Sequence, residues 1–242
     1  MPDVLRAAVL GPMAFAEGVR LQEALVAARA AGTTGDWLLF PDHPPVFTVG
    51  RSADEASFVA DREAIARRGA EVHEVSRGGD VTWHGPGQLV GYPIVDLARC
   101  GRDLHAYLRT LEDSLMDVLA SWGIQGERVA GKTGVWTGGE KIASIGIAVR
   151  RWVGYHGFAL NVAPDLAWFD LIHPCGLRGI RMTSMAERLG AAAPGIEEVR
   201  ARAAEALARR LNYERVEWTG TPEPGPDGGF RAAVVHSPRR AE

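Results

Sequence analysis

A polar, glycine-rich segment is the first place in the sequence where chemistry could be done. It reads Arg77-Gly78-Gly79-Asp80-Val81-Thr82-Trp83-His84-Gly85-Pro86-Gly87-Gln88. Glycine lets a ligand come close to the backbone and leaves N–H groups able to point at it, while the polar side chains can fix a ligand's orientation. The segment matches neither the dinucleotide-binding fingerprint nor the phosphate-binding P-loop. It therefore indicates a ligand-binding loop, with a tight structural loop between strands as the alternative.

Lys141 is the second candidate, at the start of the run Lys141-Ile142-Ala143-Ser144-Ile145-Gly146-Ile147. In a strand, Lys141 would share a face with the alternate residues from Ala143 to Val149, so its ammonium group would lie at the end of an apolar surface. Desolvation at such a place favours a reactive lysine. A lysine that reaches from the end of the strand into solvent is the alternative.

Cys175 is the third candidate and lies in His173-Pro174-Cys175-Gly176, a stretch too rich in proline and glycine for regular structure. Backbone N–H groups in such a loop can stabilise an oxyanion, so Cys175 could be a nucleophile. A Cys–His dyad would use His84, His156 or His173 as its base. A buried structural cysteine is the alternative, and that is our interpretation of Cys100, which has no companion motif.

Composition argues against several other kinds of protein. The seven histidines and two cysteines form neither H-E-x-x-H nor C-x-x-C, so no metal site is expected. A net charge of −3 argues against general nucleic-acid binding, although Arg150 with Arg151 and Arg178 with Arg181 could form a local basic patch for an acidic partner. No segment resembles a signal peptide or is apolar over the length of a membrane span. With so few cysteines, we expect a cytoplasmic protein that does not enter a membrane.

The elements that must position these residues alternate between helix and strand. Helices are expected over 14–31, 61–68, 103–122 and 196–211, and strands over 4–10, 37–40, 46–48 and within 132–162, where Gly138-Gly139 would turn a hairpin. This pattern predicts one α/β (mixed α+β) domain with a mixed, partly antiparallel sheet flanked by helices. The domain would cover 1–218, and 219–242 would be a Pro/Gly-rich C-terminal tail in which 230–235 could dock as a strand.

Taken together, these segments resemble the lipoyl(octanoyl) transferase family over roughly residues 43–183, in the family's order. The motifs that carry the resemblance are His43–Arg51, Arg77–Tyr92, Lys141–Gly146, His156–Asn161, Pro174–Gly176 and Met182–Ser184. Several motifs in one order are far more specific than any one of them alone.

The resemblance implies the fold of the biotin and lipoate protein ligases. It implies transfer of an octanoyl or lipoyl group from acyl carrier protein to a lipoyl-domain lysine, with Cys175 as the acyl-thioester nucleophile and Lys141 tuning the pKa of its thiol. The acceptors would be lipoyl domains of 2-oxoacid dehydrogenase complexes and the glycine cleavage H protein. The substrate would be bound by Arg77, Gly78, Gly79, Asp80, Val81, Thr82, Trp83 and His84, by Ser144, Ile145 and Gly146, and by His156, Gly157 and Phe158.

Neither ATP nor a metal is expected as a cofactor, because a thioester donor is already activated. Lys141 could act as an ammonium group that stabilises a thiolate or as a neutral amine that takes its proton. The acyl chain needs an apolar groove, for which Ile145, Ile147, Phe158 and Leu160 are candidates, although each could equally be ordinary core. The nearest alternative is an ATP-dependent lipoate or biotin protein ligase, which would not need the cysteine. A non-catalytic acyl- or carrier-binding protein and a cysteine hydrolase are the others.

Overall fold

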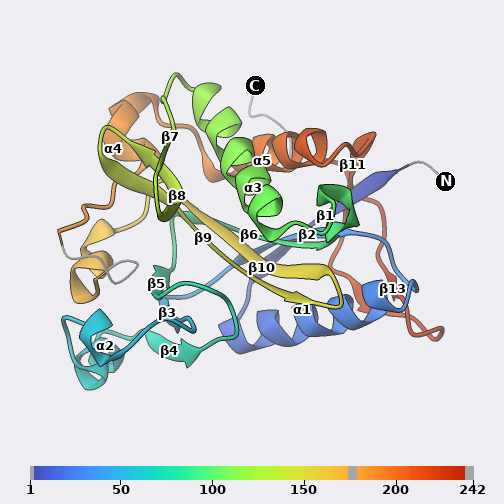
Figure 1. Cartoon of the computed structure of the whole chain (residues 1–242), viewed down its shortest axis with the longest axis horizontal. Coiled ribbons are helices and arrows are strands. Elements are labelled where there is room, and N and C mark those ends of the chain that lie inside the picture. Colours follow the sequence, from blue (N-terminus) through green and yellow to red (C-terminus); the bar gives the residue numbers. More distant parts are fainter. Residues whose placement is uncertain (1–2, 174–178, 238–242) are drawn as a thin grey trace.

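The computed structural model describes residues 3–173 and 179–237, and its centre is an eight-stranded mixed sheet (Figure 1). The strand order is β11-β1-β2-β6-β10-β9-β8-β7; β11, β1 and β2 run parallel, and every later pair is antiparallel. The expected mixed, partly antiparallel sheet is therefore confirmed. The strands are β1 (Val4–Pro12), β2 (Trp37–Asp42), β6 (Gln88–Asp96), β7 (Glu127–Val129), β8 (Lys132–Thr137), β9 (Glu140–Arg150), β10 (Val153–Asn161) and β11 (Arg215–Thr219).

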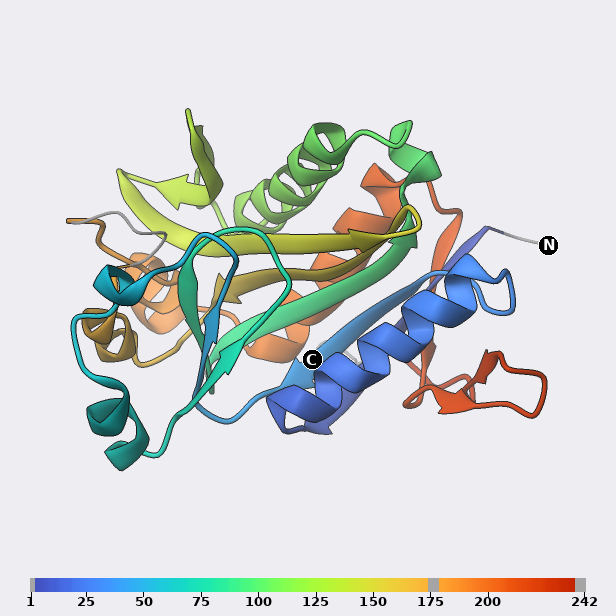
Figure 2. The ribbon, with the colours of Figure 1, turned by 60° about the horizontal axis from the view of Figure 1, so that its bottom comes forward.

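Helices cover both faces of the sheet. Helices α3 (Leu104–Ala120) and α5 (Ile196–Arg210) pack together on one face, and α1 (Phe15–Ala30) lies on the other (Figures 1 and 2). Strand β6 is buried on both sides: Leu89 packs in the cluster under α3 and α5, whereas Val90 packs in the cluster under α1. This alternation follows from the two-residue period of a strand.

A smaller, three-stranded sheet carries part of the glycine-rich segment. Strand β3 (Val46–Val49) lies between β4 (Glu71–Glu74), which is parallel to it, and β5 (Val81–His84), which is antiparallel. Its own apolar cluster includes Phe47 and Trp83 and is closed by Ile65 of α2 (Arg62–Arg67). Two 3-10 turns, η1 (Glu55–Ser57) and η3 (Leu166–Leu171), complete this end of the molecule (Figure 2).

Several expected elements have clear local causes in the structure. Asp61 and Asp103 cap α2 and α3, because each side chain accepts hydrogen bonds from backbone N–H groups of the first turn. The hairpin between β8 and β9 turns at Gly138 and Gly139, whose φ angles are +57° and +80°. Both lie in the left-handed region that suits a two-residue hairpin turn.

The remaining elements are short and connect or follow the longer helices and strands. They are the 3-10 turns η2 (Leu97–Cys100) and η5 (Gly190–Ala192), helix α4 (Met185–Leu189), and strands β12 (Glu223–Pro224) and β13 (Phe230–Arg231). The expected docking strand is present as the short β13, which pairs with β12, and as a single antiparallel bridge between Val234 and Thr219. Val235 N donates to Trp218 O at 2.9 Å, so the segment beyond 219 lies against the end of β11. The division at residue 218 stays a prediction.

Candidate active site

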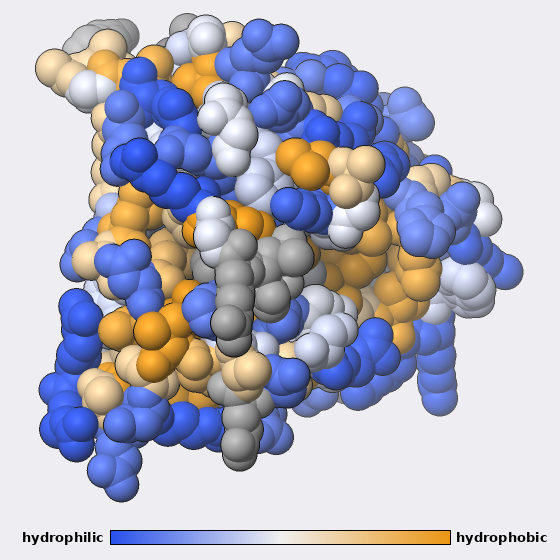
Figure 3. Space-filling view, turned by 60° about the vertical axis from the view of Figure 1, so that its left-hand side comes forward, coloured by the Kyte–Doolittle hydropathy of each residue, from blue (hydrophilic) through white to orange (hydrophobic). Residues whose placement is uncertain are grey.

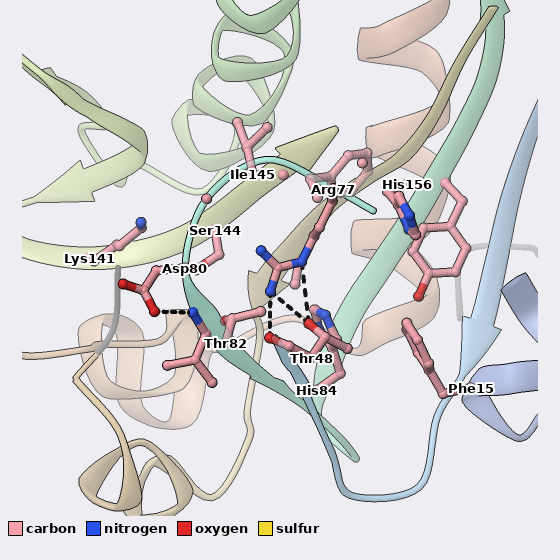
Figure 4. Close-up of a pocket in the computed structure, with 17 residues that line it drawn as sticks. Phe15, Thr48, Arg77, Asp80, Thr82, His84, Lys141, Ser144, Ile145 and His156 are labelled. Carbon is pink, nitrogen blue, oxygen red and sulfur yellow. Dashed lines mark hydrogen bonds between the residues drawn. The ribbon is translucent and has the colours of Figure 1, made fainter. Parts of the chain in front are cut away.

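A pocket opens where the small sheet meets the main sheet (Figure 4). It is a narrow cavity of about 50 Å³, and its wall is mostly apolar. Seven elements or loops contribute to the lining: Phe15, Thr48, Arg77, Gly79, Asp80, Val81, Thr82, His84, Tyr92, Lys141, Ser144, Ile145, Gly146, His156, Gly157, Phe158 and Ala159. The three predicted substrate segments thus meet around one cavity.

Two predicted binding residues do not line this pocket. Gly78 donates its backbone N–H to Ile147 O at 2.9 Å, which ties the glycine-rich segment to β9. Trp83 points the other way from its neighbours Thr82 and His84, because successive side chains of β5 face opposite sides. Its ring stacks on Trp168, with 5.8 Å between ring centres, inside the core of the small sheet.

Lys141 is buried at one end of the pocket, with 1% of its surface exposed. Its Nζ donates to Thr133 O at 2.9 Å and lies 5.6 Å from the centre of the Trp136 ring. Gly134 provides the space for this side chain, because a Cβ there would come 2.7 Å from Lys141 Cε. The alternative of a lysine that reaches into solvent is wrong.

The face expected for Lys141 is wrong for Ala143. Ile142 and Ala143 both pack in the cluster under α3 and α5, whereas Lys141 lines the pocket with Ser144, Ile145 and Gly146. The β8–β9 pairing shifts register between Val135 and Trp136. Such a bulge places two successive residues on one side of a strand and re-aims the residue before them.

Cys175 lies outside the described residues, but the chain that follows it runs beside Lys141. Lys141 N donates to Arg181 O at 3.0 Å, and Thr183 N donates to Lys141 O at 2.9 Å. Before the cysteine, His173 N donates to Ser57 O at 2.8 Å. A contact between Cys175 and Lys141 therefore stays a prediction, and the described chain on its C-terminal side is anchored to the lysine's own backbone.

Arg77 holds the glycine-rich segment against β3. Its Nη2 donates to Thr48 O at 2.6 Å and to Thr48 Oγ1 at 2.8 Å, and its Nη1 donates to Gly78 O at 3.1 Å. Glycine is required at position 146, because a Cβ there would lie 2.8 Å from Arg77 Cδ. The planar guanidinium suits this role, since it donates in several directions of one plane.

Two histidines in the pocket are held neutral near pH 7. Burial lowers the pKa of His84 to about 3 and that of His156 to about 4, with the nearby Arg77 charge acting in the same direction. His84 Nδ1 lies 3.2 Å from Gln88 Oε1. His156 has a left-handed φ of +55° within β10, and its backbone N–H donates to Gln22 Oε1 at 2.8 Å. Such low pKa values make either imidazole a weak general base.

The pocket also contains residues that we did not predict as site residues. Thr48, Tyr92 and Ala159 belong to segments that carry the family resemblance, but Phe15 has no distinguishing pattern. Of the candidates for an acyl groove, Ile145 and Phe158 line the pocket. The other two candidates, Ile147 and Leu160, pack with the core under α3 and α5.

Other kinds of site find no support in the described part of the chain. Residues 3–173 and 179–237 contain no group of three or more His, Cys, Asp or Glu side chains placed to hold a metal ion. Among the same residues, no helix has the length and apolar character needed to cross a membrane. The exposed Arg150 and Arg181 form ion pairs, with Glu23 at 3.5 Å and with Glu140 at 3.1 Å.

A family model and curated relatives agree on one family for this chain. Residues 15–208 match the model of the lipoyl protein ligase A/B catalytic domain. The chain is 54% identical over 183 residues to an octanoyltransferase of Geobacter sulfurreducens, covering 76% of this chain and 75% of the relative. It is 48% identical over 217 residues to an octanoyltransferase of Geobacter metallireducens, covering 90% and 98%.

Solved structures share the fold at much lower identity. The bipartite lipoate protein ligase of Thermoplasma acidophilum aligns with a TM-score of 0.67 and 16% identity over 94% of this chain and 89% of the other. The biotin protein ligase of Aquifex aeolicus in complex with biotin and ATP aligns with a TM-score of 0.53 and 13% identity over 86% and 70%. The fold that the motifs implied is thereby confirmed, and the chain belongs to the lipoyl protein ligase A/B catalytic domain family.

Proposed function

We propose that the protein is an octanoyltransferase of lipoate biosynthesis, which moves an octanoyl (or lipoyl) group from acyl carrier protein to the acceptor lysine of a lipoyl domain. The carrying observation is a mostly apolar pocket with a buried lysine at one end, in a chain whose relatives at 48% and 54% identity are octanoyltransferases. Lipoyl domains of 2-oxoacid dehydrogenase complexes and the glycine cleavage H protein are the proposed acceptors, and the cytoplasm is the proposed location.

The proposed reaction has two steps. In the first, the Cys175 thiolate attacks the carbonyl carbon of the donor thioester; the bond from that carbon to the carrier's sulfur breaks, and the carrier thiolate takes up a proton. In the second, the neutral amine of the acceptor lysine attacks the Cys175 thioester. The new C–N bond forms, the bond to the Cys175 sulfur breaks, and the proton lost by the amine restores the thiol. Two easier steps replace one difficult transfer.

Lys141 is the proposed activator of Cys175. A thiol near neutral pH is mostly protonated, so it needs a cation that stabilises the thiolate or a base that removes the proton. Lys141 can supply either, whereas His84 and His156 are poor bases because of their low pKa values of about 3 and about 4. The hydrogen bond from Lys141 Nζ to Thr133 O fixes the amine at the end of the pocket.

The acyl chain would extend from Lys141 along the pocket toward His156 and Phe15, which lie on the opposite side in Figure 4. Burying about seven methylene or methyl groups contributes roughly 5–6 kcal/mol before losses, at ~0.8 kcal/mol per group. The end of the molecule that carries α2 and α4 exposes apolar surface between hydrophilic side chains (Figure 3), which suits the approach of such a chain. No ATP and no metal are needed, since the donor bond is already activated.

The test is the intact mass of the protein after incubation with octanoyl-acyl carrier protein without ATP, followed by peptide mapping. We expect a hydroxylamine-labile octanoyl adduct on Cys175 that Cys175→Ser abolishes. Cys100→Ser is the matched control, because Cys100 is a half-buried free thiol whose pKa is raised by burial. Lipoyl-domain acylation that appears only with ATP and free acid would instead indicate a ligase, and no adduct or transfer under either condition would indicate a binding protein.

A further inference from the structure

A second hollow adjoins the pocket on the side away from Lys141. Its volume is about 390 Å³, and it is formed by the first turns of α1, by residues 73–76 and by His156. Phe15 and His156 are the described residues that line both this hollow and the pocket. They therefore form the partition between the two spaces, which we call the groove and the pocket.

The partition is built from rings that neighbouring groups hold in place. The Phe15 ring is 3% exposed and lies with its centre 5.4 Å from the His43 ring and 5.3 Å from the His73 ring. His43 is fixed on both sides, since Nδ1 lies 2.8 Å from Met13 O and Nε2 lies 2.8 Å from Tyr92 Oη. Phe15 thus has little freedom to turn aside for a longer ligand.

His156 completes the partition from the other side. Its ring stacks on Tyr155, with 4.9 Å between ring centres, and meets Tyr92 edge-on at 6.4 Å. Its backbone N–H is fixed by the buried side chain of Gln22. The His156 side chain also has a hydrogen-bond partner, since its Nε2 lies 3.5 Å from Ser76 Oγ. Of the two residues in the partition, Phe15 is therefore the one whose side chain can be shortened without changing a hydrogen bond.

We propose that Phe15 sets the upper limit of acyl chain length by closing the pocket against the groove; this rests on the proposed acyl transfer. A chain that begins at Lys141 ends at the Phe15 ring, and additional methylene groups would have to displace it. Removal of the ring would join the two spaces, so a longer chain could continue past Ala16 and Val19 of α1. A pocket wall distinguishes chains by ~10–200-fold per methylene group, so the shift should be large.

The experiment measures kcat/KM for hexanoyl- to tetradecanoyl-acyl carrier protein with a lipoyl-domain acceptor. Phe15→Ala should raise the dodecanoyl-to-octanoyl ratio at least ~10-fold over the wild type. Val19→Ala is the matched control: it enlarges the groove but leaves the partition intact, so its ratio should stay within about twofold of the wild type. Calorimetric binding of free octanoate and dodecanoate to the same proteins gives a readout that does not depend on catalysis.

The outcomes separate the two proposals. A folded Phe15→Ala variant that ranks the chains as the wild type does would overturn the role of Phe15 and leave the transferase standing. If the wild type transfers no acyl chain, the proposed transferase activity is wrong, and fatty-acid binding then tests the role of Phe15. Tighter dodecanoate binding by Phe15→Ala would support that role, and unchanged binding would overturn it. Should circular dichroism show that Phe15→Ala does not fold, Phe15→Leu replaces it, with a smaller shift in the same direction.

Discussion

The pocket is bounded by the amine of Lys141 at one end and by the rings of Phe15 and His156 at the other. Lys141 is fixed by backbone atoms: Thr133 O accepts from its Nζ, and Gly134 leaves the space it occupies. Phe15 is fixed by other side chains, the His43 and His73 rings. Burial lowers the pKa of His43 as it does for His84 and His156, which favours the neutral form of these three imidazoles near pH 7.

The two ends of the pocket are held differently because a buried amine and an apolar ring have different requirements. Burying an amine without a hydrogen-bond partner is unfavourable, so its acceptor has to be held in place. Glu112 holds β8, the strand that contains the acceptor Thr133, in place. Its side chain is 1% exposed, accepts from Gly134 N at 3.1 Å and pairs with Arg109 and Arg128. An apolar ring such as that of Phe15 needs only close packing, and a side chain of another size can replace it without loss of a hydrogen bond. We therefore expect the Lys141 end to govern rate and the Phe15 end to govern substrate length.

The largest expected effect is that of Lys141→Met, which keeps the length of the side chain and removes the amine. If Lys141 activates the thiol, kcat/KM should fall by roughly 10²–10⁴-fold. Lys132→Met is the control, because Lys132 Nζ lies at a similar 5.4 Å from the Trp136 ring but outside the pocket lining. Steady-state transfer and the alkylation rate of Cys175 at pH 7 are the measurements. Equal activity in both variants would contradict the expectation that the Lys141 end of the pocket governs rate.

Gly134→Ala should have a smaller effect that reaches both stability and rate. Its Cβ would lie 2.5 Å from Ala143 O and 2.7 Å from Lys141 Cε. Overpacking of this kind lowers the free energy of unfolding by about 1–3 kcal/mol, and displacement of Lys141 should lower kcat. Gly134 and Gly139 both have a positive φ, of +124° and +80°, but a methyl group added at position 139 would meet open space, so Gly139→Ala should lose only about 1 kcal/mol. Urea denaturation measures the free energy of unfolding of both variants. An equal decrease in the two would show that crowding at Lys141 contributes nothing.

The smallest effect is the pH dependence expected from the neutral histidines. The folded pKa values of His84 and His156, about 3 and about 4, lie below an unfolded value near 6.5, so below that pH the unfolded chain binds more protons. Stability should be fully present above pH 6.5 and fall as the pH is lowered, by about 1–2 kcal/mol per histidine between pH 7 and pH 5. His84→Gln should reduce this slope in urea titrations. An unchanged slope would mean that His84 is not neutral in the folded state.

Much of the architecture could be predicted because its causes are local. The Asp103 cap and the apolar stripe after it specify α3, and Gly138-Gly139 specifies the hairpin, each within a few neighbouring residues. The glycine-rich segment was harder to interpret. The whole segment Arg77–Gln88 is predicted as a loop because it is rich in glycine, but Val81–His84 forms strand β5 and Gln88 begins strand β6.

The sequence by itself determined which residue types meet in the pocket, because the motifs that contain them follow the order of a known family along the chain. Only the tertiary structure decided which of them face it. The bulge opposite Val135 turns Lys141 toward Ser144, the alternation of β5 sends Trp83 into another core, and Phe15 reaches the cavity from the start of α1. These placements depend on strand register and on helix packing between segments far apart in the chain. No local pattern records such contacts, because they are set by which neighbours each side chain finally meets.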